Sequence, residues 1–393
     1  MAQPAALIEP STASGPVDAQ GLHCWLEVDR AAFEGNVRAL QGVLGGQSRF
    51  CLVMKADAYG HGLALLMPTV LKLGISCLGI TDNAEAGAAR EAGFTGRLIR
   101  LRVAWLDEVA EGFGHRIEEL VGSLDQARGL SAVAARCPGG LRCHLALNSG
   151  GMSREGLELS GPRGREDALA MLRLPGLRIA GIMTHFPVRS QEEERPGSRR
   201  FLDEASWVLG QGGLDREKVT LHCANSYAAL NVPEARMDMV RAGGILYKPL
   251  DPDTAARYGF RSIAQFKSRV GSVNAYPAGS TVSYDRTFTL VRDSRLANVL
   301  VGYADGYRSR PAGGRTVLVG GRRAPVVGKG TMNTIMVDVT DHPEVRAGDE
   351  VVLFGRQGSE EITLDEYAKG LDCATWEEMA TSVGRQSARV LVG

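Results

Sequence analysis

The hydrophobic positions of the first 250 residues form short runs, separated by stretches with helical spacing. After Asp29, a suitable N-cap, apolar residues recur every three or four positions and predict a helix with an inner face of Phe33, Val37, Leu40 and Leu44. Eight apolar runs have the character of buried strands: Phe50–Met54, Cys77–Ile80, Leu98–Leu101, Glu119–Gly122, Cys143–Leu147, Ile179–Thr184, Val219–Cys223 and Met239–Arg241. Eight strand–helix repeats predict a (β/α)8 barrel, and a doubly wound parallel sheet is the alternative.

The pattern changes after Leu250. The expected strands are now short, often alternate between apolar and polar residues, and are separated by Gly, Pro and Asp, which predicts a mostly antiparallel β domain. These strands are Ser268–Val273, Thr281–Leu290, Leu296–Gly302, Arg315–Val319, Ala324–Val327, Ile335–Val339 and Glu350–Phe354. We therefore predict an α/β protein with a flexible tail (1–22), a barrel domain (23–250) and a C-terminal β domain (251–393). The residues before 30 are able to pack with the C-terminal domain.

The composition is that of an ordinary globular protein, with 393 residues, 44% hydrophobic residues and 23% charged residues. The 45 basic and 45 acidic side chains balance, so the charge indicates neither a nucleic-acid nor a membrane partner. The first 20 residues lack the basic start and apolar core of a signal peptide, although a mature chain that had lost its signal would look the same. The seven cysteines show no metal-ligand spacing, so no metal site is expected.

Polar residues follow the predicted barrel strands at their carboxyl ends, where barrel active sites lie. A lysine that leaves an apolar strand into a barrel mouth is partly shielded from water, which favours the neutral amine that imine chemistry needs. The loops after the last two strands are where barrels often bind phosphate, and they carry a hydroxyl and exposed backbone N–H groups. The residues concerned are Lys55, Asn148, Arg154, His185, Asn225, Ser226, Arg241, Gly243 and Gly244.

Seven motifs, in this order, resemble the alanine racemase family of pyridoxal-phosphate enzymes. They are VMKADAYGHG, MTHFPV, LHCANSYAAL, MVRAGGILY, TVSYDRTFTL, VGYADGY and GKGTMNTIMVDVT. The resemblance extends over about residues 24–390 and, through HLALNSGGMSR and VNAYPAG, is closest to the broad-specificity amino-acid racemases. It implies interconversion of L- and D-amino acids by a homodimer whose subunits share their active sites.

The resemblance also implies roles for individual residues. Lys55 matches the lysine that carries pyridoxal phosphate and acts as one base, and Tyr284 matches the second base, which reaches the site from the partner subunit. Met332 and Asn333 match partner residues near the substrate carboxylate. Tyr303 and Tyr307 are expected to line the entrance of the site. The remaining matches are Tyr59, Asn225, Ser226, Gly243 and Gly244 at the phosphate, Arg154 at the phenolic oxygen, His185 beside the ring, Arg241 at the ring nitrogen, and Asn148 with Arg154 toward the substrate.

Substrate choice stays open at this point. Broad specificity is the main expectation, because the LNSGGMSRE segment brings small and polar residues to this part of the site. A preference for lysine and arginine is expected because Glu155 stands where broad-specificity relatives carry a neutral amide. Lys248 and the lack of a tyrosine near the C-terminus are further departures from the family pattern. The alternatives are an alanine-restricted racemase and a pyridoxal-phosphate-binding carrier or regulatory protein built on the same barrel.

A disulfide between Cys51 and Cys77 is also expected, because these residues lie in consecutive predicted strands and the relatives carry a matching pair. It would indicate an oxidising compartment, the periplasm after removal of a signal, with the cytoplasm as the alternative.

Overall fold

The computed structural model describes residues 19–308, 314–373, 375–383 and 387–393, and the predicted tail lies outside the described residues as far as residue 18. The chain divides into two compact units. One is Arg30–Ile263, and the other combines the residues up to Asp29 with Ala264–Gly393.

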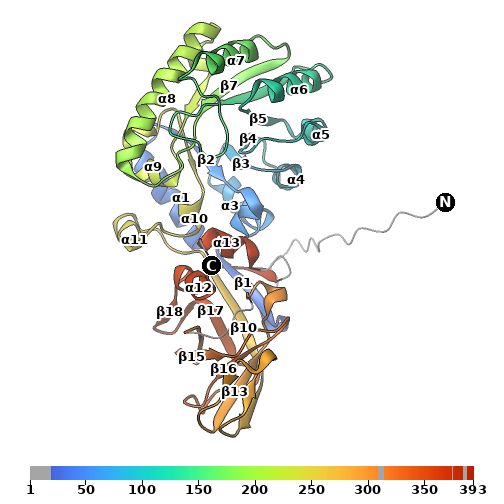
Figure 1. Cartoon of the computed structure of the whole chain (residues 1–393), viewed down its shortest axis with the longest axis vertical. Helices are drawn as coiled ribbons and strands as arrows, with labels where there is room; N and C mark the ends of the chain where they lie inside the picture. The colour runs from blue at the N-terminus through green and yellow to red at the C-terminus, as the bar shows by residue number, and fades with distance from the viewer. Residues whose placement is uncertain (1–18, 309–313, 374, 384–386) are drawn as a thin grey trace, which may run out of the picture. The chain divides into compact units, whose positions relative to one another are not determined.

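The first unit is built on a parallel sheet of eight strands in the order β8-β7-β6-β5-β4-β3-β2-β9 (Figure 1). The two ends of this sheet meet through backbone hydrogen bonds from Asp238 N to Leu221 O (3.1 Å) and from Arg241 N to Ala224 O (3.0 Å). The strands are β2 (Arg49–Val53), β3 (Cys77–Ile80), β4 (Arg97–Arg100), β5 (Ile117–Val121), β6 (Leu141–Ala146), β7 (Leu177–Met183), β8 (Thr220–His222) and β9 (Met239–Ala242). All eight predicted strands are present, and the barrel is confirmed.

Helices follow the barrel strands and lie around the outside of the sheet (Figure 1). The predicted first helix is α1 (Arg30–Leu44), and its four predicted apolar residues are all buried. The others are α2 (Lys55–Tyr59), α3 (Leu63–Lys72), α4 (Asn83–Glu91), α5 (Leu106–Glu111), α6 (Leu124–Ala134), α7 (Pro162–Leu172), α8 (Gln191–Gly212), α9 (Ser226–Asn231), α10 (Gly244–Tyr247) and α11 (Pro252–Tyr258).

The barrel unit continues past residue 250, where the sequence pattern placed the boundary, to Ile263. Asn36 on α1 accounts for this extension. Its amide nitrogen donates to Leu246 O (3.0 Å) and Arg261 O (2.7 Å), and its amide oxygen accepts from Arg261 N (2.9 Å). One buried side chain therefore ties the segment after the last barrel strand back to the first helix.

The second unit is a mostly antiparallel sheet of nine strands in the order β18-β17-β14-β15-β16-β13-β10-β1-β19. Its strand β1 (Cys24–Asp29) comes from the start of the chain and pairs antiparallel with β10 and parallel with β19. The other strands are β10 (Ala264–Tyr276), β13 (Ser294–Val299), β14 (Thr316–Val319), β15 (Arg322–Val327), β16 (Ile335–Asp338), β17 (Glu350–Gln357), β18 (Glu360–Ile362) and β19 (Ala388–Val392), and the helices are α12 (Leu364–Gly370) and α13 (Trp376–Ser382). Residues 24–29 thus pair with the C-terminal sheet, and the guanidinium of Arg269 donates to Ala19 O and Leu22 O at the described end of the predicted tail.

One predicted strand of this unit was wrong. Thr281–Leu290 is not continuous but forms a two-stranded hairpin, β11 (Thr281–Val282) and β12 (Phe288–Thr289), around a 3-10 turn over Tyr284–Arg286. Ser283, Asp285 and Arg286 all have positive φ, which an extended strand does not allow.

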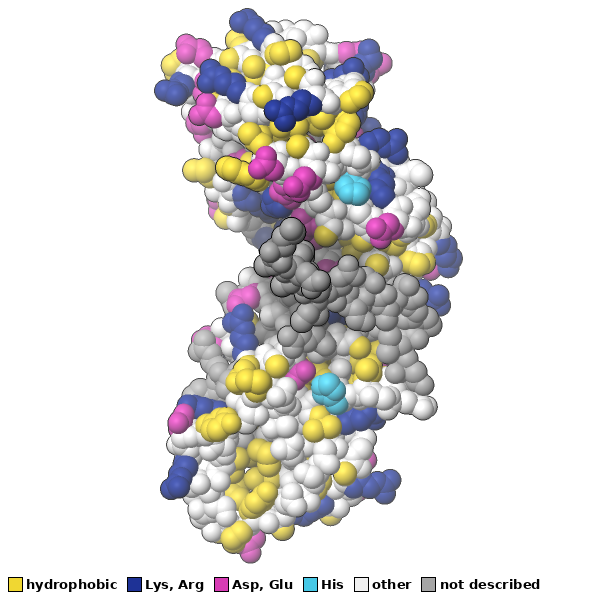
Figure 2. Space-filling view, turned by 90° about the vertical axis from the view of Figure 1, so that its right-hand side faces the viewer, with side chains coloured by type: hydrophobic (Ala, Val, Ile, Leu, Met, Phe, Trp, Pro, Cys, Tyr) yellow, Lys and Arg dark blue, Asp and Glu magenta, His cyan; other side chains and the backbone are white. Residues whose placement is uncertain are grey.

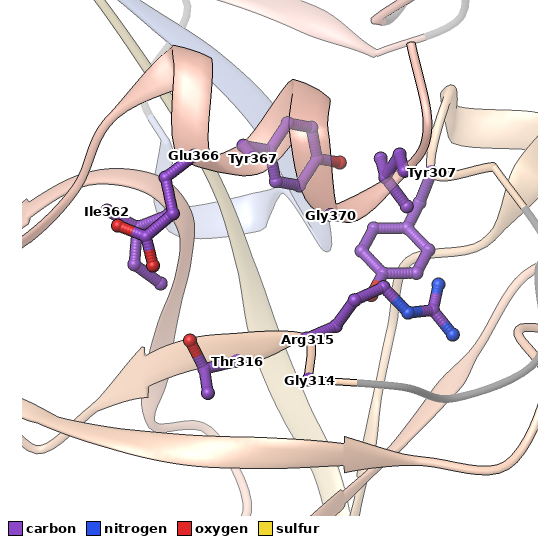
Figure 3. A pocket seen from close by; sticks show the side chains of 9 residues that line it. Tyr307, Gly314, Arg315, Thr316, Ile362, Glu366, Tyr367 and Gly370 are labelled. Carbon is purple, nitrogen blue, oxygen red and sulfur yellow. The ribbon is translucent and has the colours of Figure 1, made fainter.

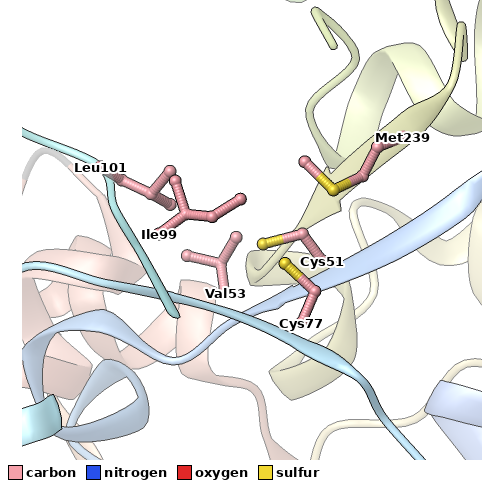
Figure 4. Close-up of a cluster of buried hydrophobic side chains, with 6 residues drawn as sticks. All are labelled: Cys51, Val53, Cys77, Ile99, Leu101 and Met239. Atoms are coloured by element: carbon pink, nitrogen blue, oxygen red, sulfur yellow. The ribbon is translucent and has the colours of Figure 1, made fainter. Parts of the chain in front are cut away.

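Cys51 and Cys77 lie in a buried apolar cluster with Val53, Ile99, Leu101 and Met239 (Figure 4). The register of β2 and β3 pairs the residues next to them, Leu52 with Leu78, and Figure 4 shows the two sulfur atoms pointing toward one another. The predicted disulfide is nevertheless not formed, and both are free thiols. The contact with Cys51, together with burial, raises the pKa of the Cys77 thiol well above its usual range.

The chain purified without reductant is therefore expected to carry two free, slowly reacting thiols here, because buried neutral thiols are poor nucleophiles. Iodoacetamide should label Cys51 and Cys77 only after the chain is unfolded, and peptide mapping gives the extent of labelling. Recovery of a linked Cys51–Cys77 peptide would contradict this expectation and would restore the argument for an oxidising compartment.

Among the described helices, none is long and apolar enough to cross a membrane. The described residues also contain no group of three or more His, Cys, Asp or Glu placed to hold a metal ion. On the face shown in Figure 2, basic and acidic side chains are interspersed, which agrees with the zero net charge.

Candidate active site

Lys55 lies two residues after the end of β2 and opens α2, whose backbone is left-handed. Ala56, Asp57, Ala58 and Tyr59 have φ between 53° and 56°. For residues with a side chain this conformation costs about 1–2 kcal/mol each. Asp57 holds the turn in place, because its N–H donates to the Glu85 carboxylate (3.1 Å) and its own carboxylate accepts from Leu63 N (2.6 Å) at the start of α3.

A buried aromatic cluster supports the same turn. The hydroxyl of Tyr247 donates to Val53 O (3.0 Å), at the last residue of β2. Its ring lies 4.9 Å from the rings of both Tyr59 and His61. The amine of Lys55 lies over the Tyr59 ring, 5.7 Å from its centre, so the cluster fixes the direction in which the lysine leaves the strand.

Arg241, on β9, is 4% exposed and places its guanidinium between the ends of two other strands, β7 and β8. It donates to Thr184 O (2.8 Å) and to His222 O (2.8 Å), and it also contacts the His185 ring (3.4 Å). Burial lowers the pKa of Arg241 to about 10, so the group remains a cation at neutral pH. Arg241 is therefore a fixed, charged donor at the carboxyl end of the barrel.

His185 lies between two arginines. Its Nε2 is 3.2 Å from Arg154, whose guanidinium also donates to Leu101 O (3.2 Å), and its Nδ1 faces Arg241. Burial, followed by the charges of Arg241, Arg154 and Lys55, lowers the pKa of His185 to about 2. The ring is neutral at physiological pH, and Lys55 lies near enough for its charge to contribute to the lowered pKa.

The residues predicted for phosphate also come together. Gly243 N donates to the hydroxyl of Ser226 (3.2 Å), and a Cβ on Gly243 would lie 2.5 Å from the hydroxyl of Tyr59. The glycine thus allows two hydroxyls and a backbone N–H to share one small cradle. Asn225 uses its side-chain oxygen to cap α9, accepting from Tyr227 N (2.8 Å) and Ala228 N (3.0 Å), and so fixes the helix that carries Ser226.

Two further predicted residues follow β6. Asn148 donates its amide to Glu158 (2.8 Å), and its amide oxygen is buried without a hydrogen-bond partner among the described residues. The Glu155 carboxylate packs against Gly122 at the end of β5. A Cβ on Gly122 would lie 2.9 Å from Oε2 of Glu155. Burial raises the pKa of Glu155. Lys248 is 8% exposed and donates to Pro249 O (3.0 Å), so its amine stays close to its own backbone.

The remaining predicted residues lie in the C-terminal unit. Tyr284 is 69% exposed at the tip of the β11–β12 hairpin, and Ser283 beside it donates to Lys329 O (2.6 Å). Met332 is 54% exposed. The segment that carries Met332 and Asn333 lies so close to Gly302 that a Cβ there would meet Met332 O at 2.3 Å.

Tyr307, expected at the entrance, is instead 2% exposed and lines a small pocket of the C-terminal unit (Figure 3). Its ring lies 5.3 Å from the Arg315 guanidinium, and Tyr367 faces the same pocket. Tyr303 is 48% exposed, so of the two only this residue lies at the surface of its unit.

Three residues that hold the site residues in position were not predicted from the sequence. These are Tyr247 and Glu85, which hold the turn after β2, and His222, whose backbone and ring both contact Arg241. A signal for Glu85 was available, since a glutamate three residues after Asp82 at a helix start has the spacing of a capping interaction.

Comparison with known proteins gives a consistent picture. Family models described as alanine racemase, N-terminal domain, and alanine racemase, C-terminal domain, match residues 28–251 and 263–391. The chain is 48% identical over 375 residues to a broad specificity amino-acid racemase of Pseudomonas taetrolens, covering 95% of this chain and 91% of that protein. It is 45% identical over 368 residues to a lysine racemase of Proteus mirabilis, covering 94% and 89%. The structure of alanine racemase from Bacillus anthracis with bound L-Ala-P covers 96% of each chain, with a TM-score of 0.86 and 25% identity.

Proposed function

The chain belongs to the alanine racemase family, and on that premise we propose that it is a pyridoxal-phosphate-dependent racemase of several free amino acids. The observation that carries the proposal is the group formed by Lys55, His185 and Arg241 at the carboxyl ends of the barrel strands. An amine, a neutral imidazole and a buried cation at one end of a barrel suit proton transfer at a carbon next to a cofactor.

The residues present fit pyridoxal phosphate. The Gly243 cradle offers the hydroxyls of Ser226 and Tyr59 to the phosphate, and the Gly243 N–H holds the Ser226 hydroxyl in place. Lys55 supplies the amine for covalent attachment, Arg241 a donor for the ring nitrogen, and Arg154 a donor for the phenolic oxygen. When bound, the cofactor supplies an electron sink that stabilises the carbanion left by removal of the α-proton.

Racemisation needs a proton to be removed on one face of the α-carbon and returned on the other. We assign Lys55 to one face and Tyr284 to the other. His185 stays neutral between its two arginines, and Arg241 retains its proton, so neither competes with these two bases for the substrate proton.

The two bases belong to different compact units, and we propose that Tyr284 completes the site of the partner subunit in a homodimer. Large apolar side chains are exposed in each unit, which supports an interface that covers them. In the barrel unit these include Trp105 (75%) and Met152 (71%), and in the C-terminal unit Val291 (93%) and Tyr284 (69%).

A substrate panel tests the proposal. The chain, supplied with pyridoxal phosphate, is incubated with single enantiomers of Ala, Ser, Met, Lys and Arg, and chiral chromatography measures the opposite enantiomer. Conversion of most of them is expected. Conversion of alanine alone would favour the alanine-restricted alternative, and cofactor binding without any conversion would favour the carrier or regulatory protein.

We further propose that Glu155 favours substrates with a cationic side chain. Its carboxylate is partly buried beside the end of β5, and the unpartnered Asn148 oxygen after β6 offers a second acceptor. Glu155→Asn is expected to lower kcat/KM for Lys relative to Ala by roughly two- to fivefold, the value of a solvent-screened ion pair. Glu155→Asp, which keeps the charge, should retain most of the preference. An unchanged Lys/Ala ratio in Glu155→Asn would contradict the role.

A further inference from the structure

Four buried side chains form a continuous line of hydrogen bonds through the inside of the barrel. Arg241 Nη1 on β9 lies 2.7 Å from His222 Nδ1 on β8, and His222 Nε2 lies 2.7 Å from His144 Nδ1 on β6. His144 Nε2 lies 2.7 Å from the carboxylate of Glu118 on β5. All four residues are at most 4% exposed, so no water replaces a partner that is lost. We call this line the Arg241–Glu118 chain.

Every bond in this chain has a fixed direction. A guanidinium only donates, so His222 must accept at Nδ1 and, as a neutral imidazole, carry its proton on Nε2. His144 must then accept at Nδ1 and donate from Nε2 to Glu118. Burial lowers the pKa of both histidines, which keeps the two rings neutral. The donors therefore all point from Arg241 toward Glu118.

Glu118 is surrounded by donors alone. Its Oε1 accepts from Arg142 Nε (2.8 Å) and Arg97 Nε (3.1 Å), and its Oε2 accepts from Arg97 Nη2 (2.7 Å) and His144 Nε2 (2.7 Å). Although burial raises the pKa of Glu118, the bonds from His144 and Arg97 hold it well below its usual range. Only an ionised carboxylate satisfies all four donors.

Gly181 makes the chain sterically allowed. It lies on β7, between the strands that carry His144 and His222, and a Cβ there would lie 2.3 Å from His144 Nδ1 and 2.6 Å from its Cε1. Because Gly181 has no side chain, the His144 ring can occupy this space and reach across β7 to His222.

We propose that Glu118 is a positioning residue for Arg241, acting through His144 and His222 to fix which donors Arg241 presents at the ring-nitrogen position of the cofactor. The proposal rests on the function proposed above. In Glu118→Gln the new amide N–H group stands either at the Oε1 position, where it faces two arginine donors, or at the Oε2 position, where it faces one arginine donor and His144 Nε2. The second position leaves fewer donors opposed. Arginine cannot become an acceptor, but a histidine can change its tautomer. Both rings then reverse, and His222 turns an N–H toward the Arg241 guanidinium.

The direct test is the position of the protons. The full chain, labelled with ¹⁵N at histidine, is measured by NMR with and without pyridoxal phosphate, with assignments from His144→Gln and His222→Gln. The wild type should show the proton on Nε2 of both rings, and Glu118→Gln should show it on Nδ1. A cationic or reversed ring in the wild type would overturn the proposal, and so would unchanged tautomers in Glu118→Gln.

Kinetics provide the second test. Glu118→Gln should lower kcat about tenfold, because the N–H of His222 is left facing the buried Arg241 guanidinium, which is also a donor. KM should change less than about threefold, because these opposed donors lie far from the substrate. Glu119→Gln is the matched control, because Glu119 is the next residue on β5, is equally buried, and binds Arg100 (2.8 Å) outside the chain. Gly181→Ala should lower kcat as Glu118→Gln does, without changing any charge.

Equal loss of kcat in Glu118→Gln and Glu119→Gln would show a merely structural effect and would overturn the proposal, as would a Gly181→Ala variant with wild-type kcat. A wild-type chain that racemises no amino acid would refute the proposed function instead, and the tautomer measurement would still decide whether Glu118 directs the chain.

Discussion

Lys55→Ala is expected to remove both the visible absorbance of the bound cofactor and racemisation, the latter by roughly 10³-fold or more, because the substitution deletes the attachment amine and one of the two bases. Absorption spectra and chiral chromatography of the purified variant measure the two losses. The fold should survive, since the Lys55 side chain is only partly buried and the turn that follows it is held by Asp57 and Glu85.

The matched control for Lys55 is Lys72→Ala. Lys72 is an exposed lysine of the same unit that pairs with Glu34 on the outside of the barrel, and its loss should leave both the spectrum and the turnover unchanged. A Lys55→Ala chain with full turnover would refute the assignment of this residue, whatever its spectrum shows.

Tyr284→Phe is expected to lower kcat by roughly 10²–10⁴-fold, the usual range for a general acid or base, while cofactor binding is retained. The substitution removes only a hydroxyl from a ring that is exposed in its own unit, so the free energy of unfolding should change little. Tyr276→Phe, at another partly exposed tyrosine of the same unit, serves as the control and should behave as the wild type.

Mixed dimers test where Tyr284 acts. Inactive Lys55→Ala and Tyr284→Phe chains, combined under conditions that exchange subunits, should regain part of the wild-type turnover, because one of the two sites in each mixed dimer is then intact. If exchange is demonstrated and no activity returns, the two bases belong to the same chain.

The barrel was predictable because its strands are buried on both faces and read as continuous apolar runs, and the topology places the residues after them at one end. Lys55, His185 and Arg241 could therefore be grouped without coordinates. The β1 strand could not be placed, since its partners β10 and β19 are distant in sequence. The hairpin around Tyr284 was missed because three residues other than glycine adopt positive φ there, which no local pattern signals.

The Arg241–Glu118 chain shows a different limit. Two glutamates within the apolar strand Ile117–Val121 were a visible irregularity, but their partners depend on the register of five strands. The space at Gly181 that lets His144 cross β7 is equally invisible in the sequence, where the residue is simply a glycine within a strand.

The place of β1 between β10 and β19 has a consequence for synthesis of the chain. At about 5–20 residues per second, the ribosome completes the segment from Arg30 to Ile263 some 12–50 s after β1 has emerged, and β19 comes last. The barrel can therefore fold while β1, with Cys24, Trp25 and Leu26 still to be buried, waits as an unpaired strand at the start of the nascent chain. Such a strand is a template for association with other chains. The C-terminal sheet closes only after translation ends, so chaperone capture and aggregation during expression should be decided by this first strand rather than by the barrel.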